Sequence, residues 1–253
     1  MAHILRTRFK KEIVAEFLSP ARLGKKRNAI ILCGGMPGIP SKSELMQFLS
    51  KKGFWVFNPR YRGTWESGGT FLKYSPEKDV CDVIDALPRG FKDLWGGKMY
   101  RVRPDNLFII AGSFGGPAGI LISRDPRVKK VVAISPVIDW LAPSKDEPLD
   151  WLETFVHDAF GNGYRFGKKE WAKLKTGTFY SPLHHQKEID GSKLLIFHAQ
   201  DDGSIRPKEV IAFAKKTKSA LRLLKTGGHL NSTFVVQKYW KEIRKFLMEK
   251  RQK

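Results

Sequence analysis

The chain has 253 residues, enough for one substantial α/β domain with room for a modest insertion. It has 46 lysines and arginines against 25 aspartates and glutamates, which gives a formal net charge of +21. The basic residues are spread along the whole chain, and no nucleic-acid-binding module is present. The charge therefore predicts no more than weak, non-specific attraction for polyanions. No apolar run reaches the roughly 18 residues of a membrane-spanning helix, residues 1–11 are too basic for a secretory signal, and two distant cysteines argue against a disulfide framework. We therefore expect a cytoplasmic protein with no membrane partner and no specific nucleic-acid partner.

Predicted strands and helices alternate along the first half of the chain. Ala29–Leu32 is a continuous apolar run, typical of a strand buried on both faces. Residues 43–52 show a helical pattern that ends at Gly53. The same criteria predict strands at 9–18, 54–58 and 107–111, and helices at 77–87 and from Pro117 onward.

An irregular segment interrupts this alternation in the second half. After a predicted strand at 128–135, residues 139–192 are rich in aromatic side chains and carry helical patterns at 149–160 and 168–174. Further on, the sequence predicts strands at 193–198 and 221–224 and helices at 207–216 and 232–251. The whole pattern predicts one α/β domain over residues 1–253, with a mostly parallel sheet covered by helices on both faces and 140–192 as a small helical cap insert. Ligands then bind at the carboxyl ends of the strands.

A single serine occupies the turn after the strand at 107–111. Ser113 is flanked by small residues, with Ala111 two positions before it and Gly115 two positions after it. A nucleophile elbow needs this arrangement, because the serine lies on a strained turn where strand and helix crowd together. Ala111 departs from the more usual glycine but still keeps a large side chain out of the contact.

Acidic and histidine residues follow later predicted strands. Asp201 and Asp202 come after the strand that ends near His198, and His229 follows the strand at 221–224. The chain order serine, aspartate, histidine is that of the α/β-hydrolase triad. We expect His229 to take the proton of Ser113 and Asp202 to orient the imidazole, with Asp201 a close second for that carboxylate. Asp139, after an earlier strand, is a weaker alternative.

The remaining chemistry needs an oxyanion hole but no cofactor or metal. The backbone N–H of Phe114, directly after the nucleophile, is one expected donor, and Gly35 is the first choice for the other, with Met36 as the alternative. The other histidines show no metal-ligand spacing with carboxylates or thiolates. Three more residues follow a strand at the same sheet edge, namely Arg60, Arg62 and Trp65. All three could approach the substrate, but Arg62 is expected to stabilise the loop instead.

Several motifs in order along the chain resemble the catalytic domain of the prolyl oligopeptidase family, which has an α/β-hydrolase fold. They are Cys33-Gly-Gly-Met-Pro-Gly, Asn58-Pro-Arg-Tyr-Arg-Gly, Ala111-Gly-Ser-Phe-Gly-Gly, Leu195-Ile-Phe-His-Ala-Gln-Asp-Asp and Gly227-Gly-His. The resemblance implies that the acid lies four residues after the strand-end histidine, which selects Asp202. The chain has no room for the β-propeller of the large peptidases, carries Cys33 where some members place an oxyanion-hole tyrosine, and lacks paired glutamates for a peptide amino terminus.

These observations predict a serine hydrolase that cleaves ester bonds through an acyl-enzyme, because stand-alone domains of the resembling type are often esterases. A peptidase acting on short peptides is the alternative within the same chemistry. A basic, non-catalytic binding protein on a hydrolase scaffold is the alternative outside it. The aromatic side chains of the cap insert favour an apolar acyl or aromatic substrate. The oligomeric state is not decided by the sequence.

Overall fold

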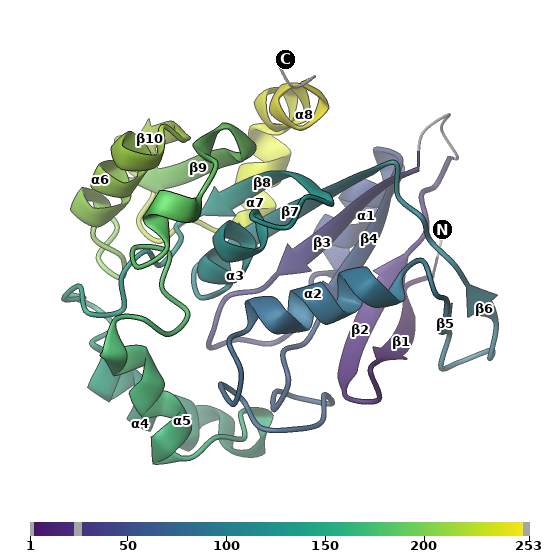
Figure 1. Cartoon of the computed structure of the whole chain (residues 1–253), viewed down its shortest axis with the longest axis horizontal. Coiled ribbons are helices and arrows are strands. Elements are labelled where there is room, and N and C mark those ends of the chain that lie inside the picture. The colour runs from purple at the N-terminus through teal and green to yellow at the C-terminus, as the bar shows by residue number, and fades with distance from the viewer. Residues whose placement is uncertain (1–2, 23–26, 250–253) are drawn as a thin grey trace.

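The computed structural model describes residues 3–22 and 27–249, and these form one eight-stranded sheet in the order β1-β2-β4-β3-β7-β8-β9-β10 (Figure 1). The six strands from β4 to β10 in this order run parallel, whereas β2 pairs antiparallel with both β1 and β4. The predicted parallel sheet and the α/β-hydrolase fold class are confirmed. The strand bounds are β1 Leu5–Phe9, β2 Ile13–Leu18, β3 Asn28–Cys33, β4 Phe54–Pro59, β7 Asn106–Gly112, β8 Val128–Ile134, β9 Leu194–Ala199 and β10 Ala220–Leu224.

Helices cover both faces of this sheet. Apolar side chains of α2, α3 and α6 pack in one buried cluster with one face of the strands, and those of α1, α7 and α8 pack in a second cluster on the other face. The α-helix bounds are α1 Ser43–Lys51, α2 Glu77–Ala86, α3 Gly115–Ile122, α4 Leu149–Phe160, α5 Lys168–Ala172, α6 Pro207–Thr217, α7 Ser232–Lys238 and α8 Trp240–Met248.

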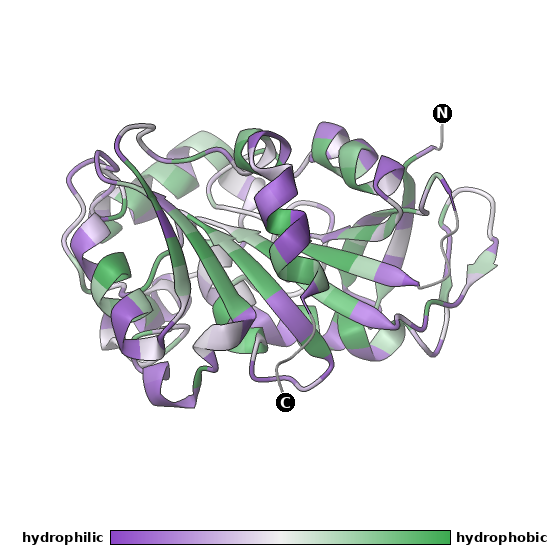
Figure 2. Cartoon of the chain, turned by 90° about the horizontal axis from the view of Figure 1, so that it is seen from above, coloured by the Kyte–Doolittle hydropathy of each residue, from purple (hydrophilic) through white to green (hydrophobic). Residues whose placement is uncertain are grey.

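The central strands are apolar on both faces, as their continuous hydrophobic runs predict. In β3, Ala29, Ile31 and Cys33 point into the first buried cluster, whereas Ile30 and Leu32 point into the second. Figure 2 shows the central strands hydrophobic along most of their length, between helices of mixed hydropathy. Each fully buried aliphatic side chain contributes about 1.5–3 kcal/mol, so this double-sided burial gives the strand ends a rigid base.

The segment between β8 and β9 carries α4, α5 and four short 3₁₀ helices, and lies at the lower left of Figure 1. Two backbone hydrogen bonds join it to the loop after β4. The N–H of Trp65 donates to the carbonyl oxygen of Gly163 at 2.8 Å, and the N–H of Phe71 donates to the carbonyl oxygen of Arg165 at 2.8 Å. Its 3₁₀ helices are Gly161–Gly163, Lys173–Thr176, Gln186–Glu188 and Gly191–Lys193. This segment therefore contacts the loop that follows β4, and its role as a cap stays a prediction.

Two sequence predictions about elements were wrong in detail, and one hairpin was not predicted. Residues 9–18 are not one strand: a turn at Lys10 and Lys11, both with positive φ, divides them into the β1–β2 hairpin. The terminal helix breaks at Tyr239, whose ring packs on Phe197 at 5.3 Å between centroids, and residues 250–251 of the predicted helix lie outside the described residues. The loop before β7 contains a short hairpin, β5 Phe91–Lys92 and β6 Met99–Tyr100.

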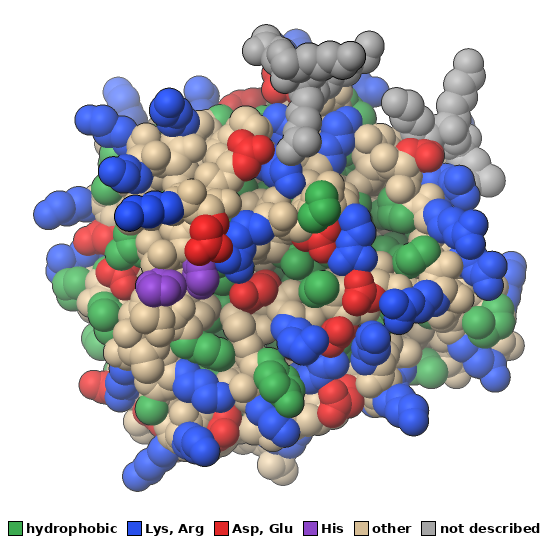
Figure 3. Space-filling view, in the orientation of Figure 1, with side chains coloured by type: hydrophobic (Ala, Val, Ile, Leu, Met, Phe, Trp, Pro, Cys, Tyr) green, Lys and Arg blue, Asp and Glu red, His purple; other side chains and the backbone are tan. Residues whose placement is uncertain are grey.

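The surface is basic without one dominant patch on the viewed face. Figure 3 shows lysine and arginine side chains scattered over this face, with aspartate and glutamate between them. Within residues 3–22 and 27–249, no helix is both long enough and apolar enough to cross a membrane.

Candidate active site

Ser113 lies in the turn between β7 and α3 with a left-handed backbone conformation, φ +51°. For a residue with a side chain this conformation costs on the order of 1–3 kcal/mol and persists only when the surroundings enforce it. Here the N–H of Ser113 donates to the carbonyl of Ile134 at 3.0 Å, and its carbonyl accepts from the N–H of Gly116 at 2.8 Å. The strained turn therefore presents the Ser113 side chain at the carboxyl end of β7.

Small residues let α3 start directly against the strands. A Cβ added to Gly115 would lie 2.2 Å from the carbonyl oxygen of Cys33, which no side chain tolerates. A Cβ added to Gly119 would lie 2.6 Å from the Cβ of Ala111. Ala111 can replace the usual glycine because Gly119 supplies the missing space, a compensation four residues beyond the expected motif.

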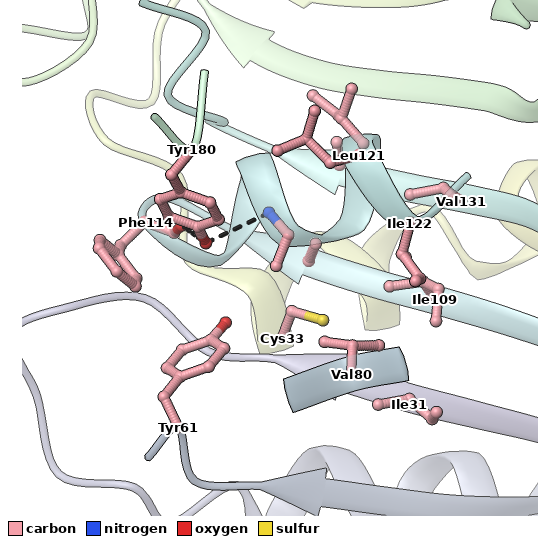
Figure 4. Close-up of a cluster of buried hydrophobic side chains, with 14 of the residues drawn as sticks. Ile31, Cys33, Tyr61, Val80, Ile109, Phe114, Leu121, Ile122, Val131 and Tyr180 are labelled. Atoms are coloured by element: carbon pink, nitrogen blue, oxygen red, sulfur yellow. Dashed lines mark hydrogen bonds between the residues drawn. The ribbon is translucent and has the colours of Figure 1, made fainter. Parts of the chain in front are cut away.

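A buried tyrosine from the insert fixes the first turn of α3. The Tyr180 hydroxyl donates to the carbonyl of Phe114 at 2.6 Å and accepts from the N–H of Ala118 at 3.2 Å, as the dashed lines in Figure 4 show. Tyr61 donates similarly to the carbonyl of Gly34 at 3.2 Å. Burial raises the pKa of the Cys33 thiol to about 12, so this neighbouring thiol is not a competing nucleophile near neutral pH.

His229 and Asp202 form a hydrogen-bonded pair. The Nδ1 of His229 lies 3.0 Å from Oδ2 and 3.2 Å from Oδ1 of Asp202, and Oδ1 also accepts from the N–H groups of Ser204 at 3.0 Å and Ile205 at 2.9 Å. Burial alone would raise the pKa of Asp202, but the bonds from His229 and Ile205 outweigh it and hold that pKa below its ordinary value. Burial alone would lower the pKa of His229, but the bond to Asp202 outweighs it and raises that pKa. With Nδ1 donating to the carboxylate, Nε2 is the basic nitrogen.

The other candidate carboxylates have different partners. Asp201 accepts from the N–H groups of Gly227 at 3.2 Å and Gly228 at 2.9 Å, so it holds the loop that carries His229 without contacting the imidazole. Asp139 accepts from the N–H of Leu141 at 2.9 Å. Of the three acids considered from the sequence, the structure brings Asp202 to His229.

Ser113 and His229 line the same cavity of about 570 Å³, together with Gly35. A Cβ added to Gly35 would lie 3.1 Å from the Cβ of Ser113, so a side chain here would require the serine to shift by a few tenths of an ångström. Within the described residues, the Ser113 hydroxyl makes no hydrogen bond, and neither the N–H of Gly35 nor that of Phe114 donates one. One hydroxyl and two backbone donors are thus free to meet a ligand in this cavity.

The arginines after β4 differ from one another in role. Arg62 forms ion pairs with Glu12, Asp79 and Asp82, which ties the loop to α2 and confirms the stabilising role expected for it. Arg60 lines the cavity, but its guanidinium is engaged by Glu16 at 3.2 Å and by Glu66 at 2.8 Å.

The remaining histidines are structural in their contacts. His198 is fully buried, and its Nε2 lies 3.0 Å from the carbonyl oxygen of Ile205, whereas its Nδ1 has no hydrogen-bond partner within the described residues. His185 lies 3.0 Å from Glu188, away from the cavity. Within the described residues no group of three or more histidine, cysteine, aspartate or glutamate side chains is arranged to hold a metal ion.

Sequence reasoning missed a carboxylate at this site. Glu147, in the irregular loop before α4, lines the cavity with Ser113 and His229. Aromatic side chains of the insert also line it, namely Phe155, Phe160 and Tyr164. The loop has no periodicity and Glu147 belongs to no motif, so nothing in the sequence distinguished it from a solvated surface glutamate.

Comparison with known proteins identifies the family of the chain and structures with a similar fold. The family model described as the prolyl oligopeptidase family matches residues 40–237. A search of curated protein sequences finds no match. Among solved structures, the acylaminoacyl peptidase of Pyrococcus horikoshii is 20% identical with a TM-score of 0.68, over 99% of this chain and 42% of the peptidase. An esterase of Pyrococcus furiosus is 18% identical with a TM-score of 0.68, over 98% of this chain and 90% of the esterase.

A putative dipeptidyl aminopeptidase IV of Bacteroides ovatus is 18% identical with a TM-score of 0.66, over 97% of this chain and 36% of that protein. The chain therefore spans less than half of these peptidases but nearly the whole esterase.

Proposed function

The chain belongs to the prolyl oligopeptidase family of serine hydrolases, and we propose that it is a carboxylesterase in which Ser113, His229 and Asp202 form the catalytic triad. The observation that carries this proposal is the His229–Asp202 pair at 3.0 Å in the loops after two parallel strands, in one cavity with a serine on a strained elbow. No metal or cofactor has a part in the proposed chemistry.

In the first half of the reaction, the Ser113 hydroxyl attacks the ester carbonyl carbon while Nε2 of His229 takes the hydroxyl proton. The Asp202 carboxylate stabilises the resulting imidazolium. The carbonyl oxygen becomes negatively charged and accepts from the N–H groups of Gly35 and Phe114, which are otherwise unused. When the C–O bond breaks, His229 returns its proton to the leaving alcohol, and an acyl-enzyme remains on Ser113.

In the second half, a water molecule replaces the alcohol. His229 takes a proton from this water as its oxygen attacks the acyl carbon, and then returns that proton to Ser113 as the carboxylic acid leaves. The same two backbone donors serve both tetrahedral intermediates, because the carbonyl oxygen occupies the same position in each.

Two observations favour esters over peptides as substrates. The structure named as an esterase is matched over 90% of its own length, whereas the two peptidases are matched over 42% and 36%. Among the described residues that line the cavity of about 570 Å³, Glu147 is the acidic one, whereas paired glutamates would be expected to meet a peptide amino terminus. Peptidase activity is the second candidate, since two of these neighbours are named as peptidases.

The test is the pre-steady-state release of 4-nitrophenol from 4-nitrophenyl acetate. The wild-type protein is expected to give a burst of one equivalent per active site, which Ser113→Ala and His229→Ala abolish. A full burst in either variant would refute the triad. Absence of both turnover and fluorophosphonate labelling in the wild type would instead favour the non-catalytic binding protein. Comparing 4-nitrophenyl esters and 4-nitroanilides of the same acyl groups then separates an esterase from a peptidase.

A further inference from the structure

A second, smaller cavity of about 50 Å³ adjoins Ser113 on the side of Phe114. Its walls are mostly apolar and come from the segment after β8, including Val137, Trp140 and Leu152. Met36, Ser113 and Glu147 line both this cavity and the larger one, so the two spaces meet at the serine. A substrate attacked by Ser113 can therefore place one part in each.

The position of His229 decides which part of the substrate occupies which cavity. In the proposed mechanism His229 gives its proton to the leaving group, so the leaving group must lie on the histidine side. His229 lines the larger cavity but not the smaller one. The smaller cavity therefore receives the acyl chain.

The charges around the smaller cavity are all of one sign. Among the described residues that line it, Asp139 and Glu147 are the charged ones, and no lysine, arginine or histidine is present. The carboxylate of Glu147 forms no hydrogen bond or ion pair within the described ranges, and one carboxylate oxygen of Asp139 accepts from the N–H of Leu141. Burial raises the pKa of Glu147, opposed by the charge of His229.

A carboxylate that is partly withdrawn from water and forms no hydrogen bond is stabilised when a positive charge in addition to that of His229 joins it. The apolar walls and the small volume restrict what can bring that charge. One water molecule needs about 10–15 Å³ of such cavity volume. The smaller cavity has about 50 Å³, so it admits a slender, unbranched chain. An alkyl chain that ends in an ammonium group fits both requirements, with its methylenes against Trp140 and its head near the carboxylates.

On the premise of the serine mechanism above, we propose that the smaller cavity is an acyl subsite for a linear chain ending in an ammonium group, and that Glu147, assisted by Asp139, binds this group. The protein then prefers esters whose acyl part carries a lysine-like side chain. Glu147 acts in this role as a specificity residue and takes no part in proton transfer.

The test compares two esters of nearly equal shape. Nα-acetyl-lysine 4-nitrophenyl ester carries the ammonium group, and Nα-acetyl-2-aminoheptanoic acid 4-nitrophenyl ester has a methyl group in its place. The wild-type protein is expected to show a kcat/KM at least about tenfold higher for the lysine ester, as for a hydrogen-bonded charge pair. Glu147→Gln should bring the ratio of the two kcat/KM values close to 1, and Asp139→Asn should reduce this ratio less.

Asp158→Asn is the matched control, because it removes an exposed carboxylate of the same insert that lines neither cavity. It should leave the preference unchanged. Equal rates of the wild type on both esters would overturn the subsite, as would a Glu147→Gln variant that loses activity equally on both. Ser113→Ala separates the two proposals: if that variant keeps its activity, the serine mechanism fails; if it is inactive and Glu147→Gln keeps the preference, the subsite alone fails.

Discussion

Replacing Asp202 by asparagine tests the proposed triad with little disturbance of the fold. The Oδ1 atom of Asp202 accepts both backbone bonds, from Ser204 and Ile205, and the amide oxygen of the asparagine side chain can keep them. The amide NH₂ then takes the place of Oδ2, which lies 3.0 Å from Nδ1 of His229. Since the NH₂ can only donate, Nδ1 must accept, and the proton moves to Nε2.

In that tautomer Nε2 has no lone pair for the proton of Ser113. A change of this kind in a serine triad costs about ten-thousandfold in kcat. We therefore expect Asp202→Asn to lower kcat for 4-nitrophenyl acetate at pH 7 by that factor, with an unchanged far-ultraviolet circular dichroism spectrum.

Asp201→Asn is the matched control. Its side chain accepts from the N–H groups of Gly227 and Gly228 and makes no hydrogen bond to His229 within the described residues, so the change should cost less than about tenfold. An Asp202→Asn variant that stays within tenfold of the wild type while correctly folded would contradict the reasoning. So would equal losses in the two variants, because the loop would then matter more than the carboxylate that contacts His229.

Three further predictions concern pH and stability. The hydrogen bond to Asp202 raises the pKa of His229 above 6.5, and only the neutral imidazole can accept a proton. We therefore expect kcat/KM to fall as the pH falls, with its half-maximal value above pH 6.5. A midpoint below this pH would contradict the pairing of His229 with Asp202. Gly119→Ala should lower the free energy of unfolding, measured by urea titration, by about 1–3 kcal/mol. Adding Ala111→Gly to the same chain should restore part of the lost free energy. No recovery would show that the two side chains do not compete for the same space. Arg62→Met should cost about 3–5 kcal/mol by the same measurement, because it leaves the buried Asp79 without its cation, whereas Asp82 keeps its ion pair with Lys78. A loss below about 1 kcal/mol would show that the ion pairs of Arg62 contribute little.

The sheet and the elbow were predictable because their signals are local. Continuous apolar runs located β3, β7 and β8 to within a residue or two at each end, and the small residues around Ser113 marked the turn. The rule that the carboxyl ends of parallel strands meet at one edge of a sheet then predicts that Ser113, Asp202 and His229 lie near one another.

The missed features depend on contacts that lie far apart in the sequence. The β5–β6 hairpin lies against β1 through a bridge between Thr7 and Asp93, which no local pattern encodes. The helix break at Tyr239 accompanies its packing on Phe197, against an amphipathic pattern that continues through it. Glu147 gained its position from the path of an irregular loop, and such a path is set by tertiary packing.

The loop that carries His229 is held from two neighbouring strands at once. After β9, Asp201 accepts from the N–H groups of Gly227 and Gly228, just before the histidine. After β8, the hydroxyl of Ser135 accepts from the N–H of Leu230 at 3.1 Å, just after it. Because β8 and β9 are hydrogen-bonded to each other, both supports move with the sheet. The imidazole is thereby placed by the same rigid layer that presents Ser113 at the end of β7, so its position follows from strand order and not from the length of a free loop.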